Sequence, residues 1–417
     1  MFILLLLAAG WYYADFYKGS LHRSAEAKSP AKDHIDPKTE SMEAYLYLNS
    51  LRQKAGLGSF YGNEKLQAAA ASHARYLAKN GADGHGESEN KPGFSGADPT
   101  QRALAAGYAS RLVTENLSSR NLDFKESVDG LFGAIYHRFA FLDPLMDEIG
   151  VAFAQDSGGR RIYVYDMGNY RLNGLCSGES FKGFGRYITG ICADREKRLR
   201  YSEYKKALNS NIGSAPKIVV WPYNGQEDVP PAFYEEIPDP LPDFSVSGYP
   251  ISVIFNLEDG RRVKVTSFRL YDEKKREVPV RVMDAKSDPN LHLKDNQFAI
   301  FPLKRLEYST TYLAQLHYIL DKKAKVKEWS FKTRSFDASM LKLLSNEDSF
   351  SIEPKRSYIL YIEPHGPNDL IGELSYAEGV AVEMLDPHTF RIEVADAKDL
   401  PLTIRAGNRK VRLLLAQ

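Results

Sequence analysis

Three polar residues in the N-terminal third of the chain, His85, Glu115 and His137, could build one site. His85 lies in the glycine-rich segment NGADGHGESENKPGFSG, where no apolar periodicity requires a packed histidine. Glu115 stands in TENL, and His137 stands beside Arg138 at the end of a helix-like stretch. The alternative for His85 is an ordinary exposed histidine.

Whether His137 faces a groove depends on the helix that carries it. The stretch 124–137 is predicted to be one helix, in which His137 lies above Gly130 and Gly133. Glycine costs about 1 kcal/mol against alanine in a helix interior, so two of them indicate that space is needed there. The space could admit a neighbouring backbone, or it could form a groove that Glu115 reaches from the preceding loop. The opposite, buried stripe of this helix holds Val128, Leu131, Phe132 and Ile135.

A fourth candidate, His73, has a spacing that favours a structural role. It follows Leu66 by seven residues and precedes Leu77 by four, which places it on the buried stripe of a predicted helix. We therefore interpret it as a core histidine with satisfied hydrogen bonds.

The elements that must position these residues are helices followed by a hairpin. Amphipathic spacing predicts helices that stop at Gly56 and Gly81, and N-cap residues at Asp98 and Asp123 predict two more helix starts. The segment EIGVAFAQDSGGRRIYVYDMG has two apolar runs around a Gly-Gly turn and predicts a hairpin. The fold class expected for residues 38–172 is therefore α+β, with helices packed on a small antiparallel sheet.

After Ala215 the apolar period becomes two. Seven short strands with turn residues between them predict an immunoglobulin-like sandwich over residues 216–334. Within it, the proline-rich segment EDVPPAFYEEIPDPLPD is expected to be an extended loop or edge. A second, small β-rich domain is expected over 335–417. The seven predicted strands are KIVVWPY, PISVIFNL, VKVTSFRLYD, VPVRVMDA, FAIFPL, TYLAQLHYIL and KEWSFKTR.

The bulk composition limits the classes of partner. The 417 residues include 55 Lys and Arg against 54 Asp and Glu, so the chain has no general attraction to nucleic acid or to anionic membranes. The connector, residues 173–215, contains the basic stretch ADREKRLRYSEYKKALNS, which is predicted to be helical. It could touch an anionic surface, but a solvated spacer helix is the preferred interpretation because acids are interleaved with the bases.

The N-terminus and the two cysteines indicate an exported protein. Residues 2–14 are apolar, about the length of a signal-peptide core and shorter than the roughly 20 residues of a membrane span. Residues 1–20 are therefore expected to be a signal peptide or a membrane anchor, with a buried helix as the alternative. Cys176 and Cys192 are expected to form a disulfide, which suits an extracytoplasmic protein. Two free buried thiols remain the alternative.

The helical part resembles a CAP-superfamily domain of the bacterial type, the fold of cysteine-rich secretory, antigen 5 and pathogenesis-related proteins. The resemblance rests on LNSLRQKAGLGSF, LQAAAASHARYLAKNG, the GH pair, GADPTQRALAAGY, TENL, YHRFAFLDPLMDEIGVAFA and YDMGN, in this order. The region from IVVWPYNGQEDVPPAF to WSFKTR resembles bacterial Ig-like domains that follow such domains. No family is evident for the C-terminal unit.

The resemblance implies a cleft lined by two histidines and two glutamates, which in some members holds a divalent cation. His85 and His137 match the histidines and Glu115 matches the first glutamate, whereas Ala134 stands at the position of the second. The aromatic residue usual three positions before it is Leu131. The resemblance thus implies a cation such as zinc, held by His85, Glu115 and His137, as the only candidate cofactor. Two neutral imidazoles and a carboxylate are suitable zinc ligands, and three protein ligands suffice for a zinc ion with an open position. We also expect Glu115 and His137 to lie within hydrogen-bond reach.

Two functions are expected from these residues. The first is an exported, non-catalytic module of the cell envelope that binds a protein, lipid or other envelope ligand, with the β domains as spacers or adhesive modules. Its N-terminal apolar segment could serve as a membrane tether. The second is a metal-dependent hydrolase of envelope peptide or glycan acting through His85, Glu115 and His137. Ala134 favours the first, because it removes the obvious general base.

Overall fold

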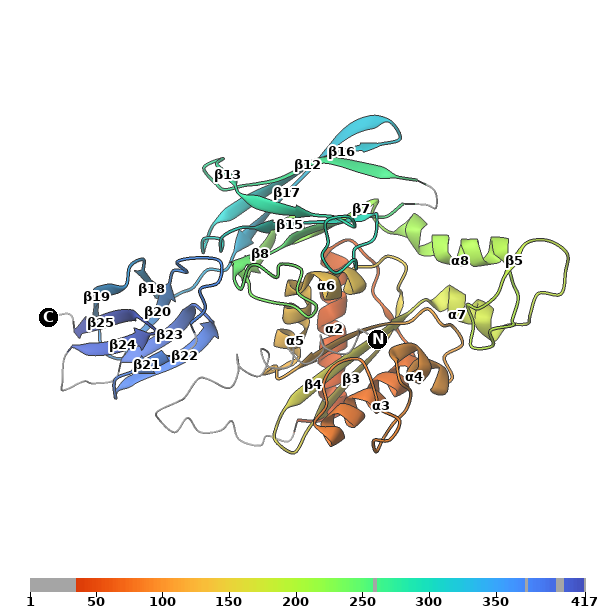
Figure 1. The fold of residues 1–417 in the computed structure, drawn as a ribbon, viewed down its shortest axis with the longest axis horizontal. Helices are drawn as coiled ribbons and strands as arrows, with labels where there is room; N and C mark the ends of the chain where they lie inside the picture. The colour runs from red at the N-terminus through yellow and green to blue at the C-terminus, as the bar shows by residue number, and fades with distance from the viewer. Residues whose placement is uncertain (1–34, 258–260, 372–373, 395–400, 416–417) are drawn as a thin grey trace, which may run out of the picture. The chain divides into compact units, whose positions relative to one another are not determined.

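The computed structural model describes residues 35–257, 261–371, 374–394 and 401–415, drawn in colour in Figure 1. Their contacts divide the chain into two compact units. One unit comprises 241–247 and 334–417, and the other comprises the rest of the described residues up to 333. The expected signal peptide or anchor at 1–20 lies outside the described residues. Across the described part of the chain, no helix is both long and apolar enough to cross a membrane.

Three helices, α2 (Pro37–Lys54), α3 (Glu64–Asn80) and α4 (Pro99–Ala105), open the N-terminal domain. They begin where the sequence supplies side-chain caps. Asp36 accepts a hydrogen bond from the amide of Thr39 at the start of α2, and Asn63 accepts one from the amide of Lys65 at the start of α3. Helix α3 ends at Gly81, whose φ of 60° is left-handed and is adopted without strain by glycine.

A four-stranded sheet forms the centre of this domain, in the order β1 (Tyr61–Gly62), β3 (Glu148–Gln155), β4 (Arg161–Gly168), β2 (Thr114–Ser119). Strands β3 and β4 form the predicted antiparallel hairpin. Alanines of α3 pack on one face, in a cluster with Ala152 and Ile162. On the other face the Tyr163 hydroxyl donates to Glu40 of α2 at 2.6 Å. Helices therefore cover both faces, as the position of α3 across β3 and β4 illustrates (Figure 1).

The single helix expected over 124–137 is wrong. The chain instead forms α5 (Phe124–Gly133) and α6 (Ile135–Phe141), separated by Ala134, whose ψ of 123° is extended. Ala134 has no side-chain acceptor with which to cap α6. The amides of Tyr136 and His137 donate instead to Oε1 of Glu236, at 2.9 and 3.2 Å. Because Glu236 lies 100 residues after Tyr136, local periodicity could not predict the break.

The connector folds into α7 (Tyr170–Ser177), β5 (Tyr187–Ile188), β6 (Leu199–Arg200) and α8 (Tyr201–Ser214). Cys176 and Cys192 are joined in a disulfide, with Cα atoms 5.2 Å apart. The basic helix expected over 193–210 begins only at Tyr201. Its first part is not helical because Leu199 and Arg200 pair with β5 as a short hairpin.

The β region that follows contains all seven predicted strands in two sheets. Phe255 of one sheet contacts Tyr318 of the other, with ring centroids 5.0 Å apart, so the two sheets pack face to face.

The segment expected as a loop or edge holds two short strands, β8 (Gln226–Val229) and β9 (Ala232–Phe233). Strand β9 pairs with β10 (Ser247–Gly248). One sheet has the order β14 (Val280–Met283), β15 (Gln297–Pro302), β11 (Ile251–Phe255), β7 (Ile218–Trp221). The other has the order β13 (Glu277–Val278), β12 (Val263–Tyr271), β16 (Thr311–Leu320), β17 (Lys323–Thr333), β8.

The N-terminal domain and these two sheets share a buried contact. The rings of Phe132 and Trp221 stack with centroids 4.2 Å apart, and the Tyr249 hydroxyl donates to the Phe132 carbonyl at 3.0 Å. Arg138, which is fully buried, donates to the carbonyl of Pro250 at 2.7 Å. Aromatic stacking and satisfied polar groups are typical of a domain core, so the two regions form one body rather than two linked by a flexible spacer.

The C-terminal unit is β-rich, as expected. Amides of Ser245 and Val246 donate to the carbonyl of Pro367, which attaches residues 241–247 to this unit. Its core includes Leu343, Leu360 and Leu413. The first sheet has the order β18 (Ser339–Leu343), β20 (Ser357–Ile362), β23 (Thr389–Val394), β22 (Val380–Asp386). The second has the order β19 (Glu347–Ile352), β25 (Arg409–Leu415), β24 (Leu402–Ala406), β21 (Leu374–Tyr376).

Candidate functional site

His85 is held by a carboxylate of the central sheet. Its Nδ1 lies 2.8 Å from Oε1 of Glu115, which projects from β2. The other oxygen of Glu115 accepts a hydrogen bond from Arg102 of α4 at 2.7 Å. Arg102 also donates to the main-chain carbonyl of His85 at 3.0 Å, so it fixes both the carboxylate and the loop. Glu115 and Arg102 are buried, whereas the His85 side chain is 47% exposed.

His73 of α3 holds the loop that carries His85 through two hydrogen bonds. The Nδ1 of His73 lies 2.9 Å from Glu87, and its Nε2 lies 3.1 Å from the carbonyl of Gly84. Glu87 in turn accepts a hydrogen bond from the Ser95 amide at 2.6 Å. His73 has no exposed surface, and this burial lowers its pKa. It lies in the core with both ring nitrogens bonded, so its role is to hold the loop.

Glu115 keeps its negative charge although its side chain is buried. Burial alone would raise the pKa of Glu115, but the hydrogen bond with His85 and the charge of Arg102 outweigh it and lower the pKa. Asp166, opposite Glu115 in the β2–β4 pair, shows the reverse: burial and then the neighbouring charge of Glu115 raise its pKa well above the ordinary value. The fold therefore favours the charged form of Glu115 and the protonated form of Asp166.

His137 is held by a carboxylate from outside the N-terminal domain. Its Nδ1 lies 2.6 Å from Oε1 of Glu236, in the loop that follows β9. The same oxygen accepts the amides of Tyr136 and His137, whereas Oε2 is buried without a hydrogen-bond partner. The Glu236 side chain is 1% exposed, so this carboxylate is almost wholly removed from solvent.

The two histidine rings lie close together, where the sequence predicts a cleft. Their ring centroids are 6.5 Å apart and their planes are 26° apart. The hydrogen bond expected between Glu115 and His137 is not the one formed: Glu115 bonds with His85, and His137 bonds with Glu236. The break at Ala134 explains the difference, because it turns His137 toward the loop after β9.

A comparison with known protein families finds a match for the N-terminal domain. Residues 45–167 match the model of the CAP family, described as the cysteine-rich secretory protein family. This part of the chain is a CAP domain. The matched residues include His85, Glu115 and His137, whereas Glu236 lies beyond them. No curated protein matches the chain.

Three solved structures are similar to parts of the chain. An outer surface protein from Borrelia burgdorferi has 23% identity and a TM-score of 0.29, over 32% of this chain and 95% of that chain. An extracellular SCP-domain protein from Bacillus anthracis str. Ames has 15% identity and a TM-score of 0.28, over 31% and 40%. A cysteine-rich secretory protein from Staphylococcus aureus has 18% identity and a TM-score of 0.25, over 32% and 40%. The chain spans less than half the length of the latter two.

The donor set of the CAP cleft fits a metal ion only in part. Each histidine uses Nδ1 to bond with a carboxylate, which leaves Nε2 as the free ligand atom. A carboxylate behind a histidine commonly fixes the tautomer and orientation of a metal ligand. Among the described residues, however, no group of three or more His, Cys, Asp or Glu side chains is arranged to hold a metal ion. Glu115 thus orients the ring of His85 and does not act as a third ligand next to it.

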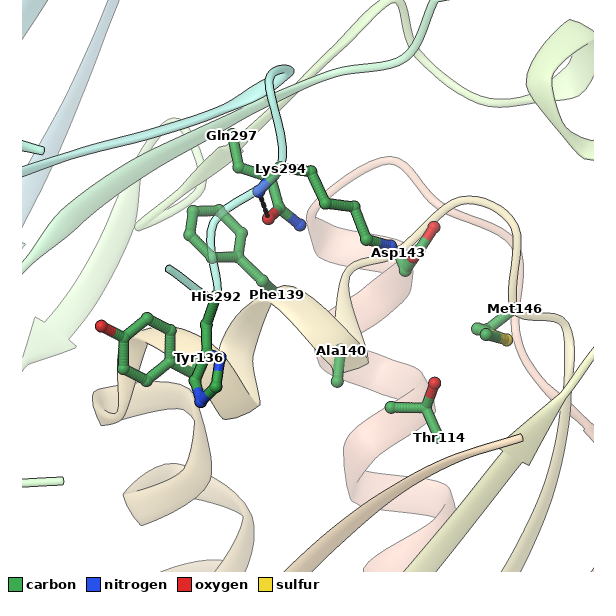
Figure 2. Close-up of a pocket in the computed structure, with 9 residues that line it drawn as sticks. All are labelled: Thr114, Tyr136, Phe139, Ala140, Asp143, Met146, His292, Lys294 and Gln297. Carbon is green, nitrogen blue, oxygen red and sulfur yellow. Dashed lines mark hydrogen bonds and ion pairs between the residues drawn. The ribbon is translucent and has the colours of Figure 1, made fainter. Parts of the chain in front are cut away.

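A pocket of about 210 Å³ lies between the CAP domain and the loop before β15 (Figure 2). Thr114 and Tyr136, which line it, directly precede Glu115 and His137 in the sequence. Its rim carries an ion pair between Asp143 and Lys294, 2.9 Å apart. The pocket is therefore built jointly by the CAP domain and the β region beside the cleft. Its lining residues are Thr114, Tyr136, Phe139, Ala140, Asp143, Met146, His292, Lys294 and Gln297.

Sequence reasoning found the two histidines and Glu115 but missed three residues that position them. Arg102 lies in a predicted helix, and only its isolation among apolar residues in QRALAAGY signals a buried partner. Asp166 is an acid inside an otherwise apolar strand, which is a comparable signal. Glu236 gives no signal, because it is one of several acids in a proline-rich loop of another domain.

Proposed function

We propose that the chain is an extracytoplasmic CAP-domain protein that binds a ligand or partner at the His85–His137 cleft without catalysing its conversion. The observation that carries this proposal is the engagement of both cleft carboxylates. Glu115 is bonded with His85 and Arg102, and Glu236 with His137 and the helix amides. A hydrolase needs a general base in contact with the reacting water. Neither carboxylate is available for that role, because both are buried.

The partner would be a protein, lipid or other component of the cell envelope. The edges of the two imidazoles offer Nε2 atoms to a polar group, and the adjoining pocket offers apolar surface from Phe139 and Met146. The disulfide, the apolar N-terminus and the name of the matched family support a location outside the cytoplasm. In this proposal the two packed sheets are an Ig-like domain that completes the cleft.

A divalent cation such as zinc would bind through Nε2 of His85 and of His137, with Glu115 and Glu236 holding the rings. Two protein ligands are fewer than those of either structural or catalytic zinc sites. Binding should therefore be weak, and it should weaken further as pH falls because histidine coordinates in its neutral form.

The test combines metal titration with activity assays on the full chain. Calorimetry should detect weak zinc binding in the wild type and none in His137→Ala, with unchanged binding in the control His317→Ala on β16. Peptide, ester and glycan substrates should not be hydrolysed with or without zinc. If zinc-loaded wild type hydrolyses an envelope substrate, and His137→Ala or Glu115→Ala abolishes this without unfolding, the competing hydrolase function replaces the binding function.

A further inference from the structure

The connector between the CAP domain and the sheets concentrates positive charge. Residues 178–206 contain eight Lys and Arg against four Asp and Glu, a net charge of +4 in a chain whose total is +1. The same residues include five aromatic side chains. We call residues 178–206 the cationic lobe; Figure 1 shows its β5 region projecting from the rest of the unit. Its charge is therefore local and is not offset by an acidic region within it.

The base of the cationic lobe is covalently and sterically fixed. The Cys176–Cys192 disulfide closes it, and the buried cluster of both cysteines with Leu172 and Leu199 fills the space beneath. Lys197 donates to the carbonyl of Cys176 at 2.6 Å, which joins the end of α7 to the returning strand. The projecting loop is thus presented on a firm support.

Three arginines of the cationic lobe, Arg186, Arg198 and Arg200, lie over its aromatic rings. The guanidinium carbon of Arg198 lies 3.7 Å from the centroid of the Tyr187 ring. Arg186 lies 4.4 Å from the Tyr201 ring. Such contacts hold a cation in place while it stays charged and accessible to an anion.

An aromatic residue stands at the tip. Phe184 is fully exposed and lies between Gly183 and Gly185, with Lys182 and Arg186 two residues to either side. Gly185 has a φ of +121°, which favours glycine, and a Cβ at Gly183 would lie 2.7 Å from the ring of Phe181, which would have to move. This backbone places an unsupported phenyl ring in water with a cation on each side. A large exposed apolar side chain in such a setting is typical of a surface that meets a partner.

We propose that the cationic lobe binds the surface of an anionic phospholipid membrane, with Phe184 inserted at the interface. Lys182 and Arg186 would contact headgroup phosphates, and Tyr187 would lie at the level of the headgroups, where amphipathic rings accumulate. A projecting tip with one apolar ring matches a flat, deformable interface. The proposal is independent of the cleft.

The test uses the full chain and vesicles of phosphatidylcholine, with or without about one third phosphatidylglycerol. Sedimentation should show binding to the anionic vesicles that high salt weakens. Lys182→Glu combined with Arg186→Glu should reduce it at least about tenfold. Phe184→Ala should reduce it several-fold without altering thermal unfolding, because the ring is fully exposed. Lys323→Glu with Lys325→Glu, the same charge change on exposed residues of β17, should leave it unchanged. The N-terminal segment is common to all variants and cannot produce these differences.

A site-specific readout comes from Phe184→Trp. The difference between its emission and that of the wild type isolates the new indole from the three native tryptophans. Its emission should shift to the blue on anionic vesicles only. Equal loss in both charge-reversal variants, or an unshifted emission on bound protein, would overturn the proposal. So would lobe-dependent binding of a soluble acidic polysaccharide without vesicle binding.

Discussion

The two histidines of the cleft are held in place by different parts of the chain. His85 depends on Glu115 and Arg102, which come from β2 and α4 of the same CAP domain. His137 depends on Glu236, which comes from the β region. The first half of the cleft is therefore a property of the CAP domain alone, whereas the second half exists only when the CAP domain and the sheets are packed together. In a cleft of this kind, the position of His137 depends on the contact between the CAP domain and the β region.

The largest loss in the free energy of unfolding should follow from replacing Arg102, which supports the His85 half of the cleft. Arg102→Met leaves the buried carboxylate of Glu115 without its cation, and removing one partner of a buried pair costs about 3–5 kcal/mol. Chemical denaturation should show this loss in the free energy of unfolding. Arg75→Met, at an exposed position of α3, serves as the control and should change it by less than about 0.5 kcal/mol. A loss below about 1 kcal/mol for Arg102→Met would show that Glu115 does not need this partner.

The His137 half should respond less to the loss of its carboxylate. Glu236→Ala removes the acceptor for two amides and one imidazole, and unsatisfied buried donors cost about 1–3 kcal/mol. Hydrogen exchange at Tyr136 and His137 should accelerate while exchange in β3 stays slow. Glu236→Gln keeps an acceptor and should restore much of the protection.

The neighbouring exposed Glu235→Ala is the control for Glu236 and should leave these amides unchanged. If exchange at His137 is the same in Glu236→Ala as in the wild type, the two halves of the cleft do not differ in the way described above.

The smallest effect concerns the Glu115–Asp166 pair and its dependence on pH. Because the folded pKa of Asp166 is raised, the aspartate destabilises the fold increasingly as pH rises above its unfolded value of about 3.9. Asp166→Asn carries no such charge, so its free energy of unfolding at pH 7 should exceed that of the wild type. The gain should vanish below pH 4.

The pKa of Glu115 is shifted in the opposite direction from that of Asp166, so its effect on stability has the opposite dependence on pH. Its folded pKa is lowered, so its contribution is present above the unfolded pKa of about 4.3 and is lost as pH falls through the folded pKa. Denaturation of the wild type and of Glu115→Gln as a function of pH should show curves that converge in acid. Curves that stay parallel from pH 7 into acid would contradict the assigned charges.

The sequence predicted those parts of the fold and site that depend on nearby residues. Periods of 3.6 and 2 located α2, α3, the β3–β4 hairpin and the seven strands, because each pattern records which face of one element is buried. His85, Glu115 and His137 were found through short motifs of the CAP type. The break at Ala134 and the delayed start of α8 at Tyr201 escaped prediction. Each is set by a partner outside the segment, Glu236 in one case and β5 in the other.

The buried arginine beside His137 has a consequence for how such proteins can be rearranged. Arg138 is enclosed by the carbonyls of Phe132 and Pro250 and by the ring of Tyr249. A gene fusion that transferred the first 215 residues to a new neighbour would strip these partners from a residue that has no exposed surface. Recombination that exchanged the sheets would need to supply Trp221 and Tyr249 again. The CAP domain and its adjoining sheets are therefore expected to be inherited as one piece.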